Sequence, residues 1–136
     1  MFSHIQIGAK DLPLLAAFYD RVLPELGLVR KTALDDIGPA GIIWARPAQR
    51  WPQFVVNYPF NGLPATWANG GQVSFAAPSQ EAVASAWSVA ITQGGMDEGA
   101  PGIRDRYACD YYGAYCRDPE GNKICFVFAD GIDCAY

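Results

Sequence analysis

The sequence has few charged side chains and no cluster of basic ones. Asp, Glu, Lys and Arg make up 18% of the 136 residues, and the formal net charge is −4. Nucleic acids and anionic membranes are bound through clustered lysine and arginine, so the composition argues against both as partners. No apolar stretch is long enough to span a bilayer, and the first residues form a strand-like pattern rather than a basic and apolar leader. We therefore expect a cytoplasmic protein.

Cysteine pairs of the metal-binding or redox type are also absent. All four cysteines lie in the last quarter of the chain, and no two of them form a C-x-x-C pair. They are Cys109, Cys116, Cys125 and Cys134. The spacing argues against a zinc ribbon or a thioredoxin-type motif. In a reducing compartment we expect these side chains to be free thiols.

What the sequence does contain is one pattern written twice. The alternating run from Phe2 to Gly8 recurs from Gly71 to Ala76. Gln72 in the second run corresponds to His4 in the first, at an offset of 68 positions. The same offset relates Asp11 to Ser79, Phe18 to Ala86, Tyr19 to Trp87 and Gly27 to Gly95. Two copies of this length indicate a duplicated small unit rather than a solenoid. Such a duplication places equivalent side chains around a pseudo-two-fold axis, where a ligand can bind.

Hydrophobic periodicity predicts that each copy begins with a strand and a helix and continues with further strands. The expected strands are 2–8, 28–34, 41–46 and 53–58 in the first copy, and 71–76, 111–117 and 123–129 in the second. The expected helices begin after the N-caps Asp11 and Ser79; the first ends at Pro24 and Gly27, and the second runs to about Gln93. Residues 59–69 are expected to link the halves, and 94–106 to form a loop.

The chain is therefore predicted to be an α+β protein with one domain over residues 1–136. It would contain two tandem βαβββ modules, at about 1–60 and 70–130, with curved mixed sheets around a central cavity. Its 136 residues suffice for one domain with a hydrophobic core.

The two faces of the expected strands differ in polarity. One face is apolar and would pack on the helices, whereas the other carries His4, Gln6, Gln53, Asn57, Gln72, Ser74 and Lys123. This polar face could line a cavity or simply face solvent. Aromatic residues near the strand ends favour the cavity, because ligand pockets combine apolar walls with a few polar groups. The predicted ligand-binding residues are Trp44, Gln53, Val55, Asn57, Ser74, Tyr111 and Tyr115, with Trp51 as a further pocket candidate.

The chain resembles the vicinal oxygen chelate superfamily, which includes glyoxalase I, bleomycin resistance proteins and extradiol dioxygenases. The resemblance covers nearly the whole chain and depends on His4-Ile-Gln-Ile-Gly with Asp11, on Gly71-Gln72-Val73-Ser74-Phe75, and on the run Asp118-Pro119-Glu120-Gly121-Asn122-Lys123-Ile124. It implies two βαβββ modules that build curved sheets around a metal or ligand cavity, and it implies a homodimer.

In this family a divalent metal is held from the first and last strands of each module. The resemblance places these positions at His4, Val55, Gln72 and Cys125. Val55 cannot bind a metal, and Cys125 stands where the family usually has glutamate. His4, Gln72 and Cys125 could still hold zinc, nickel, manganese or iron if the thiol ionises. Without a carboxylate the site is expected to be degenerate, so the prediction favours no cofactor.

The sequence leaves three functions open. The first is a glyoxalase- or bleomycin-resistance-like protein that binds a small molecule between the modules. The second is a lyase, isomerase or dioxygenase with a variant metal site, in which Tyr111, Tyr115 or Arg104 would take part in catalysis. The third is a thiol enzyme in which His4 activates Cys125, although no motif supports it.

Overall fold

The computed structural model describes residues 1–34 and 38–132. The predicted free thiol Cys134 lies outside this range, as do the last residues of the predicted domain. Module one contains β1 (His4–Gly8), α1 (Leu12–Val22), a 3-10 turn η1 (Leu23–Leu26), β2 (Val29–Leu34), β3 (Gly41–Ala45) and β4 (Gln53–Asn57). Module two contains β5 (Val73–Ala76), α2 (Gln80–Thr92), β6 (Met96–Ile103), β7 (Tyr112–Arg117) and β8 (Lys123–Phe128).

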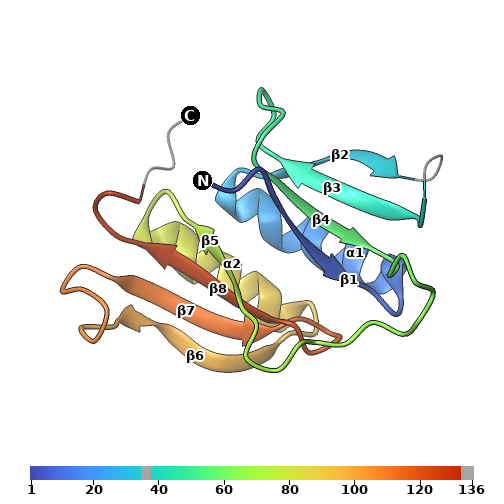
Figure 1. Ribbon diagram of the computed structural model, residues 1–136. Helices are drawn as coiled ribbons and strands as arrows, with labels where there is room; N and C mark the ends of the chain where they lie inside the picture. The colour runs from blue at the N-terminus through green and yellow to red at the C-terminus, as the bar shows by residue number, and fades with distance from the viewer. Residues whose placement is uncertain (35–37, 133–136) are drawn as a thin grey trace.

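Each module forms one four-stranded mixed sheet with one helix on its face. The strand orders are β1-β4-β3-β2 and β5-β8-β7-β6, so β1 and β5 are edge strands in equivalent places. In Figure 1, α1 lies behind β1 and β4, α2 lies behind β5 and β8, and β1 and β5 face each other across the middle of the molecule. The predicted α+β fold with two βαβββ modules is confirmed, and the sheets curve without closing.

The predicted helix starts follow from their capping residues. The Asp11 side chain accepts a hydrogen bond from the Leu14 amide at 3.0 Å, and the Ser79 hydroxyl accepts one from the Ala82 amide at 3.1 Å. Each side chain satisfies one of the amides that a helix start leaves unpaired. The first helix ends in η1, after which Gly27 takes a left-handed conformation with φ of 77°.

One predicted element was wrong. Residues 94–106 were expected to form a loop, but Met96–Ile103 forms the edge strand β6. Its pairing with β7 shifts register on both sides of Gly99, whose φ is 155°. An edge strand tolerates bulges, glycine and proline because only one side of its backbone is paired. The turn-forming composition of this segment concealed the strand.

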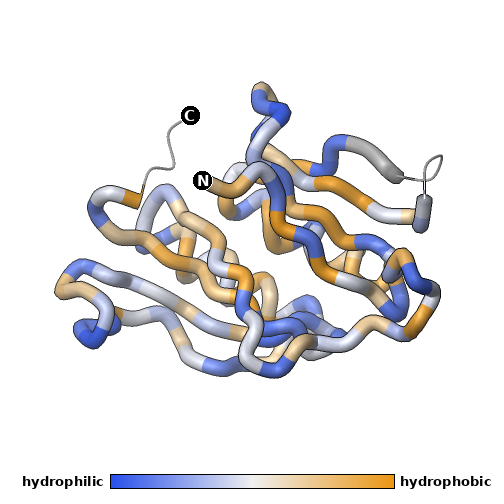
Figure 2. Tube along the Cα trace, in the orientation of Figure 1, coloured by the Kyte–Doolittle hydropathy of each residue, from blue (hydrophilic) through white to orange (hydrophobic). Residues whose placement is uncertain are grey.

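The core lies between the sheets and the helices and is continuous across the modules. Phe54 of β4 meets Phe75 of β5 edge to face at 5.1 Å between ring centroids, and Phe75 also contacts Phe126 of β8. Tyr19 and Trp44 are fully buried on the same side. Figure 2 shows hydrophobic strands in both modules and hydrophilic tips on the β3–β4 and β6–β7 connections.

A buried polar cluster also joins the modules. The Asp118 carboxylate, in the turn between β7 and β8, accepts a hydrogen bond from the Tyr19 hydroxyl of α1 at 2.8 Å. It also accepts bonds from the Asn122 side-chain amide and from the backbone amides of Glu120 and Asn122. Burial, and then the neighbouring carboxylate of Asp118, raise the pKa of Tyr19 well above its ordinary value, so the phenol stays a donor. We call this turn, Asp118–Asn122, the latch turn.

The latch turn makes a second attachment to module one. The Glu120 carboxylate accepts hydrogen bonds from the backbone amides of Lys10 at 2.6 Å and Asp11 at 2.8 Å, just before α1 begins. The family-like D-P-E-G-N run therefore fixes the position of α1 relative to module two. No helix in the described part of the chain has the length and apolar character needed to cross a membrane.

Candidate functional site

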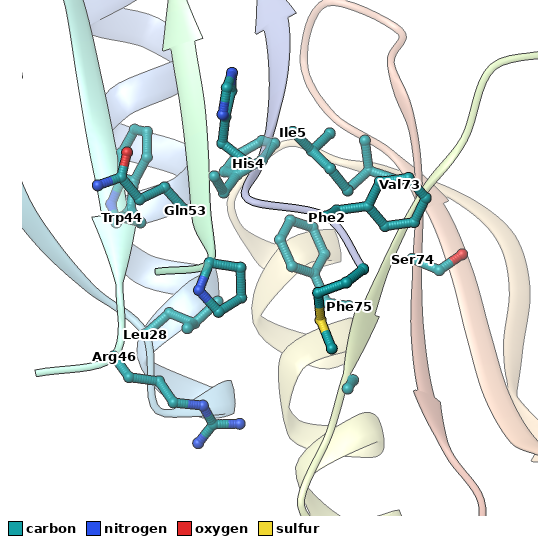
Figure 3. Close-up of a pocket in the computed structure, with 14 residues that line it drawn as sticks. Phe2, His4, Ile5, Leu28, Trp44, Arg46, Gln53, Val73, Ser74 and Phe75 are labelled. Carbon is teal, nitrogen blue, oxygen red and sulfur yellow. The ribbon is translucent and has the colours of Figure 1, made fainter. Parts of the chain in front are cut away.

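The two modules enclose a cleft between β1 and β5. Its volume is about 400 Å³, and it receives residues from β1, β3 and β4 on one side and from β5 on the other. Figure 3 shows Phe2 and Phe75 in the middle, Leu28 and Arg46 on the module-one side, and Val73 and Ser74 on the module-two side. The volume lies within the range of small-molecule pockets.

The edge positions of β1 and β5 explain why a cleft forms here. The parallel ladders β1–β4 and β5–β8 place Ile5 beside Phe54 and Val73 beside Ile124. Val73 and Phe75 of β5 belong to the shared core, and Ile7 of β1 packs against it, while the unpaired sides of the two edge strands are left to border the cleft. Ten of the fourteen lining side chains are apolar; the four polar ones are His4, Arg46, Gln53 and Ser74. The cleft thus has the composition of a ligand pocket rather than of a solvated groove.

A second group of polar side chains lies on module two. The Tyr111 hydroxyl is 3.7 Å from the Cys125 sulfur and 3.5 Å from the Tyr115 hydroxyl. Burial raises the pKa of the Cys125 thiol and of both phenols. These groups are consequently neutral hydrogen-bonding groups at neutral pH.

Two cations flank Tyr115 on this face. The Arg104 guanidinium and the Lys123 ammonium lie 5.7 Å and 5.8 Å from the centre of the Tyr115 ring. Arg104 also donates to the carbonyls of Ala100 and Ile103. Tyr111, Tyr115 and Arg104, the predicted catalytic candidates, therefore lie close together on module two.

The predicted metal-binding residues have different partners within the protein. His4 is exposed, contacts the Ser3 hydroxyl at 2.9 Å, and has its ring 6.2 Å from that of Trp51. Gln72 donates to the Ser74 hydroxyl at 2.9 Å, and Cys125 is fully buried beneath Tyr111. Within residues 1–34 and 38–132 no cluster of three or more His, Cys, Asp or Glu could hold a metal ion.

The predicted ligand-binding residues fall into different surroundings. Gln53 and Ser74 line the cleft. Trp44 also lines it, although its side chain has no solvent-exposed surface and its indole N–H donates to Asp20 at 2.9 Å. Val55 is buried in β4, opposite Gln6 of β1.

Asn57 ends β4, and its buried side-chain oxygen has no hydrogen-bond partner among the described residues. Within that same part of the chain Cys109, Cys116 and Cys125 are free thiols, of which Cys109 is exposed and the others buried.

Sequence reasoning missed several residues of the cleft wall. Three of them, Phe2, Leu28 and Arg46, lie in the cleft lining but had been placed only at the ends of expected strands. The fourth, Phe75, had been placed on the face that packs against the helices. The signal for Phe75 was present, since it lies in the edge strand β5 that repeats β1. Arg46 gave no signal, because an Arg-Pro pair after a strand is ordinary turn chemistry.

Comparison with known proteins supports the fold and the resemblance. No protein-family model matches the chain, and no curated protein matches it. Among solved structures, it is similar to a glyoxalase/bleomycin resistance protein from Albidiferax ferrireducens, with 38% identity, 93% of this chain and 97% of that chain covered, and a TM-score of 0.77.

Two more distant structures share the fold. One is a glyoxalase/bleomycin resistance protein/dioxygenase family enzyme from Burkholderia phytofirmans, with 20% identity, coverage of 92% and 95%, and a TM-score of 0.65. The other is a glyoxalase-related enzyme from Fulvimarina pelagi, with 15% identity, coverage of 95% and 88%, and a TM-score of 0.69. With the two βαβββ modules and the identity to the Albidiferax protein, the chain belongs to the glyoxalase/bleomycin resistance protein/dioxygenase superfamily, also called the vicinal oxygen chelate superfamily.

Proposed function

We propose that this protein binds a small molecule in the cleft between β1 and β5. The observation that carries the proposal is a cavity of about 400 Å³ to which both modules contribute mostly apolar side chains. Burying an apolar ligand there would remove exposed hydrophobic surface such as Phe2, which is 78% exposed. The few polar groups in the wall would orient the ligand.

The donor set of this chain does not fit the divalent metal that is frequent in the superfamily. The positions that the resemblance assigns are occupied by one imidazole, one amide, one thiol and the apolar Val55. Burial raises the pKa of the Cys125 thiol and so disfavours the thiolate that a metal would need. We therefore propose binding without a metal, and we derive no catalytic step through one.

Metal content tests this part of the proposal. The protein is purified without a metal-binding tag and measured after incubation with manganese, iron, nickel or zinc. We expect the wild-type protein to bind no stoichiometric metal, so His4→Ala should leave the metal content unchanged. Metal that is bound near one equivalent and lost in both His4→Ala and Cys125→Ser would contradict the proposal and favour a metal-dependent lyase or dioxygenase.

A filled cleft tests the binding proposal directly. Ile5 is 38% exposed at the cleft edge, so Ile5→Trp is expected to narrow the cavity. Leu14→Trp is the matched control, because Leu14 is 46% exposed on α1 outside the cleft. We expect the neutral fluorophore phenylnaphthylamine to bind the wild type and Leu14→Trp alike, and Ile5→Trp at least about tenfold more weakly. Absent or equal binding in all three proteins would refute the site.

Two further expectations accompany this function. Homodimer formation is suggested by the family, and sedimentation equilibrium would test it. A cytoplasmic location is suggested by the composition, and cell fractionation would test it.

A further inference from the structure

The charge of the cleft wall is one-sided. Its lining, as far as the chain is described, contains one arginine and one histidine but no aspartate or glutamate. The whole chain carries a formal net charge of −4, so the formal charge of this lining is opposite in sign to that of the chain. The local charge is therefore complementary to an anion.

Arg46 supplies the permanent charge of this wall and has no internal partner. Two other arginines form ion pairs: Arg30 pairs with Asp20, and Arg117 pairs with Glu98. The half-buried Arg46 guanidinium forms no hydrogen bond or ion pair with any residue of 1–34 or 38–132. Its five N–H donors remain available to a ligand in a geometry that suits two oxygens of one acid group.

The equivalent position in module two shows what an internal partner would look like. Trp44 pairs with Phe54 in the β3–β4 hairpin, and Cys116 pairs with Ile124 in the β7–β8 hairpin. Counting two residues onward from Trp44 and Cys116 makes Arg46 the counterpart of Asp118. Asp118 is buried and satisfied by four hydrogen bonds within the protein. At equivalent positions, module two therefore has Asp118, which is fully hydrogen-bonded within the protein. Module one has Arg46, an unpaired cation beside the cleft.

We propose that the ligand of the cleft is a small amphipathic anion. Its aromatic or branched apolar body would lie against Phe2, Leu28 and Phe75, and its acid group, such as a carboxylate or sulfonate, would meet the Arg46 guanidinium. Figure 3 shows Arg46 at one edge of the pocket and the two phenylalanines in its middle, which matches a ligand that is polar at one end. This inference rests on the proposed binding function and adds the ligand's chemical class.

Two fluorophores with the same aromatic framework test the charge preference. Anilinonaphthalene sulfonate is anionic, and phenylnaphthylamine is its neutral counterpart. For the wild type we expect tighter binding of the sulfonate, weakened by added salt, whereas binding of the neutral probe should not weaken with salt. Arg46→Gln should weaken the sulfonate by at least about tenfold and leave the neutral probe unchanged, because a charge-assisted contact is lost. Arg46→Lys should fall between the two, since lysine keeps the charge without the bidentate geometry.

The control variant is Arg21→Gln, which removes the same charge from an exposed position of α1 outside the cleft lining. It should leave both affinities unchanged. If both probes bind equally, or if Arg21→Gln and Arg46→Gln weaken the sulfonate alike, the anionic class is refuted while the binding function stands. If neither probe binds, the binding function itself fails.

Discussion

The two modules repeat one strand order but use their last hairpins differently. In module two the hairpin between β7 and β8 is attached to module one through Tyr19 and through the backbone before α1. In module one the hairpin between β3 and β4 has nine residues between its paired Trp44 and Phe54, against seven between Cys116 and Ile124. The longer hairpin borders the cleft. A duplicated fold can thus use one copy of a hairpin to hold the modules together and the other to border a cavity.

The outer faces of the two sheets also differ at equivalent positions. Val55 of β4 lies opposite Gln6 of β1, whereas Cys125 of β8 lies opposite Ser74 of β5. Tyr111 covers Cys125 in module two. Module two therefore carries a neutral network of thiol and phenol groups on this face. Module one has no such network there, and it supplies the Arg46 cation of the cleft.

Breaking the latch turn should have the largest effect. Asp118→Ala leaves the buried Tyr19 hydroxyl, the Asn122 amide and two backbone amides without an acceptor. We expect the free energy of unfolding to fall by about 3 kcal/mol, because buried donors without partners are costly. Arg46→Ala, at the counterpart position, should change it by less than about 0.5 kcal/mol. Urea denaturation measures both values, and equal losses would show that the two hairpins do not differ as described.

The helix starts provide a smaller contrast. Glu120→Ala removes a carboxylate that accepts bonds from two backbone amides before α1, and should cost about 1.5 kcal/mol. Ser79→Ala removes the local cap of α2, which depends on a single bond to Ala82, and should cost about 1 kcal/mol. In a double-variant cycle Glu120→Ala should couple with Tyr19→Phe, whereas Ser79→Ala should be additive with it. Additivity in both cycles would contradict a cooperative latch turn.

Cys125→Val gives module two the residue type that module one has at the equivalent position, Val55. Valine fills a similar volume, and the Tyr111 hydroxyl loses only a long contact to sulfur, so we expect a loss below about 1 kcal/mol in thermal or urea unfolding. Alkylation at neutral pH gives an independent check. The exposed Cys109 should react far faster than Cys125, whose pKa is raised by burial. Fast labelling of Cys125 would instead revive a thiol enzyme.

Local patterns in the sequence were sufficient for the fold. The caps Asp11 and Ser79 and the alternation in β1 and β5 depend on neighbouring residues only, so they were visible without a structure. The strand β6 was not, because Gly99 and Pro101 are turn formers that an edge strand accommodates only through bulges in its pairing with β7. Pairing partners, rather than composition, determine such a strand.

The cleft was harder to predict than the fold because it depends on distances between modules. The sequence placed Trp44 in a pocket, and it does belong to the cleft lining, but its indole N–H is bonded to Asp20 and its side chain has no exposed surface. Arg46 could not be matched to Asp118 by the repeat offset of 68, because Val73 and Cys116 in module two lie four positions further apart than their counterparts Ile5 and Trp44 in module one. That equivalence appears only once the strand pairs are known.

The smallest expected change in stability comes from substituting His4 and Gln72, which occupy equivalent positions in the repeat. Both side chains are exposed, and each is hydrogen-bonded only to a nearby serine hydroxyl within the described chain. His4→Ala and Gln72→Ala should each change the free energy of unfolding by less than about 0.5 kcal/mol. Because the two positions are equivalent in the repeat, similar small values are expected from both modules. A loss of 2 kcal/mol or more in His4→Ala alone would mean that its imidazole stabilises module one through a contact absent from module two, and the symmetry of the two strand edges would no longer hold.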